Sequence, residues 1–108
     1  MAMGTYRAPL EDMNFIIDEL LDVEGTLGGL PAFADLGVGA ELTTALLDEA
    51  GKVASELLAP LRRVGDEQPA TCSEGRVTAS PGYEEGLRQM AAGGWIGIAA
   101  DAGYGGQG

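Results

Sequence analysis

The sequence contains no histidine and a single cysteine, Cys72. The absence of histidine excludes a Ser-His-Asp triad and the histidine ligands on which most zinc sites depend. A catalytic cysteine also needs a basic partner, and one cysteine cannot form an intrachain disulfide. Because disulfides belong mainly to oxidising compartments, the lone cysteine favours a reducing one.

Basic residues are scarce, with 6 Lys and Arg against 17 Asp and Glu and a formal net charge of -11. This balance argues against a nucleic-acid partner and against an anionic membrane surface, since both require basic patches. The sequence shows no secretory signal, and its apolar stretches are shorter than a bilayer span. We therefore expect a soluble, cytoplasmic protein without a membrane or nucleic-acid partner.

Paired carboxylates occur several times but do not indicate an active site. Residues adjacent in a helix point about 100° apart, so sequence neighbours such as Asp48 and Glu49 do not face one substrate. Runs of this kind are usually solvated helix faces. No catalytic residue and no metal ligand set can be identified from the residues alone.

Apolar spacing predicts a first helix that begins at Pro9 and ends near Gly25. Proline suits the first helical position, and the acidic residues that follow suit the helix dipole. The expected apolar stripe consists of Met13, Ile16, Ile17, Leu20 and Leu21, widened by Phe15. Residues 25–39, rich in glycine, are expected to form a loop with a short helical turn.

The strongest helical pattern covers residues 39–63. Its apolar positions keep one face, from which we expect the core of the protein to be built, with Leu46 and Leu57 buried. Pro60 is expected to kink or close this helix around residues 56–59. The apolar positions are Leu42, Leu46, Val53, Leu57 and Leu61, widened by Leu47, Ala50, Ala54 and Leu58.

The remaining elements are shorter. Residues 71–78 can form a small hairpin about Glu74-Gly75. Ser80 as N-cap and Pro81 as first helical residue then predict a helix that ends at Gly93. The expected class is all-α: one domain over residues 1–108, a small bundle of three to four helices with Gly-rich loops.

The last six residues, Gly103 to Gly108, have the spacing G-x-G-x-x-G of a dinucleotide-binding loop. That motif requires a preceding strand, a following helix and a later acidic residue for the ribose. The sequence supplies none of them, because the preceding apolar stretch is short and interrupted by glycine. A loop whose glycines allow the backbone to turn is the better interpretation.

Several short stretches together resemble the acyl-CoA dehydrogenase family, and most closely its branch with an N-terminal helical extension, which includes 3-methylmercaptopropionyl-CoA dehydrogenases. Arg62, where the family often has asparagine, and Pro69, where a glycine is usual, depart from the pattern in one loop. The matching stretches are Tyr6 to Phe15, Leu58 to Asp66, Ser80 to Gly86, Gly93 to Trp95 and Gly103 to Gly108.

The resemblance implies an N-terminal helical domain, with residues 1–38 as the extension and 39–108 as the helical core segment. In that family a β-domain and a C-terminal helical bundle follow, FAD lies between them, and a glutamate of the C-terminal region removes the α-proton of the acyl-CoA. None of the FAD-binding or catalytic positions falls within residues 1–108. The resemblance assigns Gly105, Gly106, Gln107 and Gly108 to a loop beside the acyl cavity.

Three functional hypotheses follow. The first is the N-terminal helical part of a flavin-dependent acyl-CoA dehydrogenase, inactive and without FAD when alone, which meets the acyl-CoA only through the rest of the enzyme. The second is a non-catalytic helical interaction or oligomerisation module. A nucleotide-binding protein ranks last. We also expect association, as a homo-oligomer or with a chain that carries the missing domains, through Leu46, Val53 and Leu57 or through Trp95 and Ile96.

Overall fold

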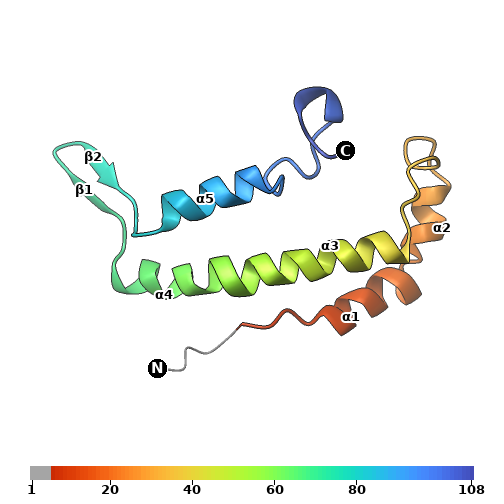
Figure 1. Ribbon diagram of the computed structural model, residues 1–108, viewed down its shortest axis with the longest axis horizontal. Helices are drawn as coiled ribbons and strands as arrows, with labels where there is room; N and C mark the ends of the chain where they lie inside the picture. Colours follow the sequence, from red (N-terminus) through yellow and green to blue (C-terminus); the bar gives the residue numbers. More distant parts are fainter. Residues whose placement is uncertain (1–5) are drawn as a thin grey trace. The chain divides into compact units, whose positions relative to one another are not determined.

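The computed structural model describes residues 6–108 (Figure 1), so residues 1–5 of the expected extension 1–38 lie outside the described residues. The chain divides into two compact units, residues 1–55 and residues 56–108. Each unit is built from helices and loops, and they are described separately below.

The first unit begins with a helix that changes its hydrogen-bonding pattern half-way along. The α-helix α1 (Leu10–Phe15) follows Pro9 and continues as the π-helix η1 (Ile16–Leu20). The helix α3 (Ala40–Lys52) packs against α1, which runs alongside it in Figure 1. The Thr44 hydroxyl lies 3.2 Å from the Asn14 side-chain oxygen, to which it donates a hydrogen bond between the two helices.

The expected end of the first helix at Gly25 is wrong, because the helix already ends before Asp22. Asp22 adopts a left-handed conformation with φ 44°, and its carboxylate accepts a hydrogen bond from the Gly25 N–H at 3.3 Å. Aspartate is one of the few side chains that tolerate both roles. A second helix, α2 (Val23–Gly28), therefore runs through Gly25, and turns over residues 30–37 lead to α3.

Pro60 does not close the long helix. The π-helix η2 (Val53–Leu58) replaces the α-helical pattern just before the proline, and the α-helix α4 (Ala59–Glu67) continues beyond it. Proline has no N–H and crowds the carbonyl four residues earlier, so a wider turn before it accommodates the ring. The expected helix end near residues 56–59 is therefore wrong, and the expected kink at Pro60 stays a prediction.

The second unit contains a β-hairpin, so the expectation of an all-α fold is wrong. Strands β1 (Thr71–Ser73) and β2 (Arg76–Thr78) pair antiparallel, with Cys72 opposite Val77. Glu74 and Gly75, both with positive φ, form the turn that a two-residue hairpin favours. The fold is mostly helical with one two-stranded sheet, and the expected helical bundle is not what the structure shows.

Helix α5 (Tyr83–Ala92) has Gly82 as its N-cap, two residues after the expected N-cap Ser80. Gly82 has φ 84°, which is not a helical conformation, so the helix cannot begin at Pro81. Gly93 ends the helix as expected. A Cβ atom on Gly82 would lie 2.8 Å from the Leu61 side chain, and one on Gly86 would lie 2.6 Å from it. These glycines let Leu61 of α4 reach the start of α5.

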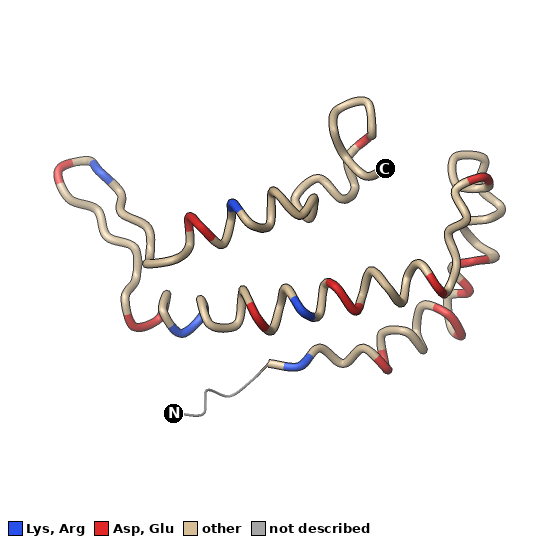
Figure 2. The backbone as a smooth tube through the Cα atoms, in the orientation of Figure 1, with Lys and Arg blue, Asp and Glu red and all other residues tan. Residues whose placement is uncertain are grey.

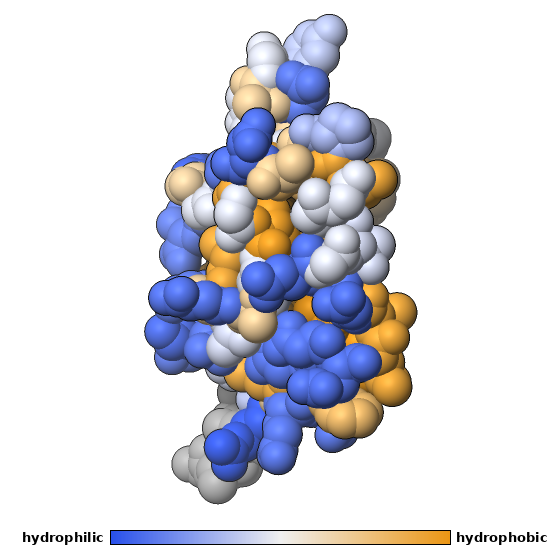
Figure 3. Space-filling model, turned by 90° about the vertical axis from the view of Figure 1, so that its right-hand side faces the viewer, coloured by the Kyte–Doolittle hydropathy of each residue, from blue (hydrophilic) through white to orange (hydrophobic). Residues whose placement is uncertain are grey.

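No hydrophobic side chain of residues 6–108 is buried, so the expectation of a buried core along residues 39–63 is wrong. Leu46 is 43% exposed, and Leu57 is only half-buried. The apolar face exists as the spacing predicts, but within its unit the chain offers too few partner side chains to cover it. Figure 3 shows hydrophobic side chains reaching the surface among hydrophilic ones.

We expect Gly82→Ala to destabilise the second unit by about 1–2 kcal/mol, because an L-residue is strained at that φ and its methyl group would displace Leu61. Gly28→Ala is the matched control, since a Cβ there has nothing within 4 Å. The measurement is chemical denaturation followed by circular dichroism. Equal stability of the two variants would contradict the packing described for Leu61.

Candidate functional site

The C-terminal segment from Gly97 to Gly108 folds into a compact loop. Its centre is the 3₁₀-helix η3 (Ala102–Tyr104), which Asp101 caps: the Asp101 carboxylate accepts a hydrogen bond from the Gly103 N–H at 2.6 Å. Gly105 then turns the chain with φ 86°. This is the loop that the sequence marks by its G-x-G-x-x-G spacing.

After Gly105 the chain returns along the start of the loop. The Gly106 N–H donates to the Asp101 carbonyl, the Gln107 N–H to the Gly97 carbonyl at 3.2 Å, and the Gly108 N–H to the Ala100 carbonyl at 2.9 Å. A Cβ atom on Gly106 would lie 2.6 Å from the Ala100 Cβ and closer still to the Ala100 carbonyl. Glycine is therefore required where the two backbone segments touch.

These hydrogen bonds leave the G-x-G-x-x-G stretch itself, residues 103–108, without free N–H donors for a phosphate. A dinucleotide-binding loop holds the pyrophosphate on free backbone N–H groups. Here the N–H groups of Gly103, Gly105, Gly106, Gln107 and Gly108 all donate within the loop. Turns rather than a strand precede it. The G-x-G-x-x-G spacing thus serves close backbone packing in this chain.

The four residues assigned to a substrate-cavity loop follow one another at the end of the described chain. The returning segment of the loop consists of Gly105, Gly106, Gln107 and Gly108, and the Gln107 side-chain amide lies close to Gly94. Their place beside an acyl cavity remains a prediction. The neighbouring Tyr104 is 92% exposed.

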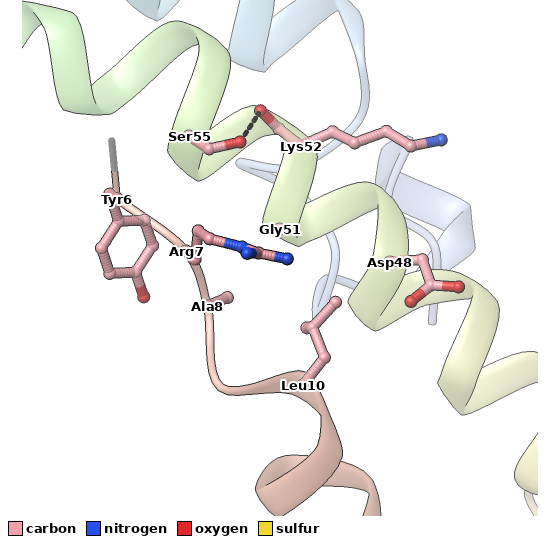
Figure 4. A pocket seen from close by; sticks show the side chains of 8 residues that line it. All are labelled: Tyr6, Arg7, Ala8, Leu10, Asp48, Gly51, Lys52 and Ser55. Atoms are coloured by element: carbon pink, nitrogen blue, oxygen red, sulfur yellow. Dashed lines mark hydrogen bonds between the residues drawn. The ribbon is translucent and has the colours of Figure 1, made fainter. Parts of the chain in front are cut away.

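A second candidate site lies in the first unit and was not predicted from the sequence. A cavity of about 330 Å³ separates the segment Tyr6–Leu10 from the last turn of α3 (Figure 4). A Cβ atom on Gly51 would lie 3.4 Å from the Leu10 side chain, which is an ordinary van der Waals contact. The cavity is lined by Tyr6, Arg7, Ala8, Leu10, Asp48, Gly51, Lys52 and Ser55.

The charge of the cavity wall differs from that of its surroundings. Arg7 and Lys52 are the only basic residues between positions 1 and 55, a stretch that carries many acidic ones, and both line the cavity. Figure 2 shows how sparsely basic residues occur along the chain. Lys52 pairs with Glu49 at 2.6 Å on the surface. The two basic residues are 45 positions apart in the sequence, so no local sequence motif revealed the cavity.

The described residues contain no other recognisable centre. Within residues 6–108 no three acidic or cysteine side chains gather in a way that could hold a metal ion. The helices of that part of the chain are too short or too polar to cross a membrane. Cys72 is exposed on the hairpin and unpaired.

Comparison with known proteins gives one relevant similarity. No family model matches the chain. The chain is 31% identical over 104 residues to the 3-methylmercaptopropionyl-CoA dehydrogenase of Ruegeria pomeroyi (strain ATCC 700808 / DSM 15171 / DSS-3). The match covers 96% of this chain but only 17% of that protein, so the chain spans about one sixth of its relative's length. The resemblance seen in the sequence thus agrees with a similarity to one acyl-CoA dehydrogenase-type protein that extends over nearly all of this chain.

Proposed function

We propose that this chain is the N-terminal helical part of a flavin-dependent acyl-CoA dehydrogenase, which forms an α,β-double bond in an acyl-CoA thioester. The observation that carries the proposal is the similarity over 96% of the chain to a much longer dehydrogenase of this kind. In this role residues 1–38 are an extension, and the segment 39–108 contributes to the wall of the acyl cavity and to subunit assembly.

The exposed apolar surface supports a role as part of something larger. A compact protein of 11.1 kDa exposes about 5,700 Å², and two separate compact units of half that mass expose together about 6,900 Å². The chain exposes 8220 Å², more than either value. Further domains or chains would cover the apolar side chains that α1, α3 and α5 leave uncovered.

Strongly exposed apolar side chains lie in both units. Leu20 is 66% exposed and Leu36 62% in the first unit, while Leu87 is 61% and Ile96 58% exposed in the second. Isolated exposed leucines are ordinary, but this many, with no buried hydrophobic residue among residues 6–108, is typical of an interface. Ile96 belongs to the surfaces expected from the sequence, whereas Leu20, Leu36 and Leu87 do not.

FAD does not fit either of the two candidate sites described within residues 6–108. The N–H groups of Gly103 to Gly108 all donate within the loop, and a cavity of about 330 Å³ is at the lower end of ligand-binding pockets. The cofactor would be held by the domains that follow in the family. This segment would only shape the cavity in which the acyl chain lies, so we assign it no catalytic residue.

We accordingly expect the 108-residue chain alone to bind no FAD and to turn over no acyl-CoA. Purified chain is incubated with FAD, separated from free cofactor and assayed with acyl-CoA substrates and an artificial electron acceptor. Stoichiometric bound flavin, or acyl-CoA turnover above the rate measured without protein, would show that residues 1–108 contain an FAD or catalytic site, which we do not assign to them.

The function of the whole protein is tested on material isolated from its native source with an antibody against this chain. We expect that material to oxidise an acyl-CoA thioester in the presence of an electron acceptor. If it contains this chain and partner proteins but no flavin and no dehydrogenase activity, the chain is a non-catalytic interaction module instead.

A further inference from the structure

The open cavity beside α3 is lined by Arg7, a solvent-exposed cation. Arg7 forms no ion pair and no hydrogen bond with the side chains described in residues 6–108. Two other arginines are engaged in local ion pairs: Arg63 with Glu67 at 2.7 Å, and Arg88 with Glu84 and Glu85. The N–H donors of the Arg7 guanidinium are thus available to a ligand in the cavity.

The Arg7 side chain lies along the cavity between the Tyr6–Leu10 segment and α3. Figure 4 shows the Arg7 side chain extending from the Tyr6–Leu10 segment toward Gly51, with Leu10 and Asp48 beyond it. The absence of a side chain at Gly51 leaves space on the helix surface opposite the guanidinium. Lys52 also lines the cavity, and its ammonium group is paired with Glu49 at 2.6 Å.

The backbone of the cavity wall is also unusual. Lys52 is the last residue of α3, and Ser55 belongs to the π-helix η2 that follows. The Ser55 hydroxyl donates to the Lys52 carbonyl at 3.3 Å, which satisfies a carbonyl where the helix pattern changes. Single π-helical turns within α-helices occur frequently at functional sites.

We propose that this cavity binds the anionic oxygen group, carboxylate or phosphate, of a small ligand, with Arg7 as the principal donor and Lys52 as a second positive charge. A guanidinium suits such groups because its N–H donors form a planar fork. Asp48 limits the ligand: it repels a second negative group and favours a hydroxyl or amine at that end. This inference is independent of the proposed dehydrogenase role, which assigns no ligand to residues 6–55.

The test is a titration of the 108-residue chain with inorganic phosphate and, separately, with acetate, at constant ionic strength, followed by amide NMR shifts. We expect saturable shifts at Ala8, Gly51 and Ser55. The anion that binds more tightly identifies the ligand group. Arg7→Gln should weaken binding about tenfold or more, since a hydrogen bond to a charged group contributes that much.

Two variants make the result specific. Asp48→Asn should strengthen binding about threefold, because it removes the opposing charge, whereas Arg88→Gln makes the same charge change as Arg7→Gln in the other unit and should leave binding unchanged. Arg7→Lys, which keeps the charge, provides a folded comparison if Arg7→Gln perturbs the amide spectrum. Absence of saturable shifts, or equal weakening by Arg7→Gln and Arg88→Gln, would overturn the proposal.

Discussion

Replacing Gly106 with alanine is expected to open the C-terminal loop. The new methyl group would overlap the Ala100 carbonyl, which is backbone and cannot rotate away as a side chain could. The chain from Gly106 onward would have to separate from Gly97 and Ala100, so the hydrogen bonds of Gln107 and Gly108 would be lost. Backbone strain of about 1–3 kcal/mol together with these bonds gives a cost of about 2–4 kcal/mol.

Amide hydrogen exchange at Gln107 and Gly108 measures this opening directly. A cost of about 2 kcal/mol corresponds to exchange about thirtyfold faster than in the original chain. Gly97→Ala is the matched control in the same loop, since its Cβ would lie at an ordinary 3.7 Å from Gly106. Unchanged exchange in Gly106→Ala would mean that the two backbone segments do not touch.

The isolated chain is expected to self-associate at micromolar concentration and to bind a hydrophobic dye. Hydrophobic residues make up 45% of the sequence, yet none of those described is buried. Burial of apolar surface contributes about 25 cal/mol per Å². The repulsion of a net charge of -11 is screened beyond about 8–10 Å at ordinary salt. Hydrophobic association should therefore prevail.

Sedimentation velocity tests this association and its origin. The double variant Leu20→Gln/Leu87→Gln, which changes one strongly exposed leucine in each unit, should weaken association at least about tenfold. Gln68→Ser, at an exposed polar position, is the control and should have no effect. Added salt should strengthen association. A monodisperse monomer that binds no dye, or association that salt abolishes, would show that apolar contact is not its cause.

Sequence reasoning located most elements but misjudged how they end. Helical spacing identified the regions of α1, α3 and α5, and the Glu74-Gly75 pair identified the hairpin turn. The helix ends were predicted wrongly where a residue can adopt either a helical or a left-handed backbone conformation. Asp22 rather than Gly25 interrupts the first helix, and Gly82 prevents Ser80 and Pro81 from starting the last one.

The expected core failed for a different reason. Apolar periodicity shows which face of a helix is apolar, but it does not show whether residues of the same chain cover that face. Leu46 lies on such a face and is exposed. The cavity beside α3 could not be predicted from the sequence, because Arg7 and Lys52 come to line one cavity only when the Tyr6–Leu10 segment lies along α3.

The loop shows how a local motif is resolved by its hydrogen bonds. The G-x-G-x-x-G spacing is compatible with a phosphate cradle and with a tight turn, and the sequence context favoured the turn. In the structure Asp101 accepts from the Gly103 and Gly106 N–H groups, through its side chain and its carbonyl respectively. Backbone N–H groups that donate within the loop are not available to a nucleotide. The role to test is therefore that of a loop in the wall of the acyl cavity.

The most direct test of the central proposal is the intact mass and flavin content of the protein that contains this sequence, isolated without crosslinking from its native source. We predict that the sequence is found in a flavoprotein, either within a polypeptide about six times its length or as a tightly bound subunit of an assembly of that size. A flavin-free protein of 11.1 kDa as the sole native form would contradict the proposal.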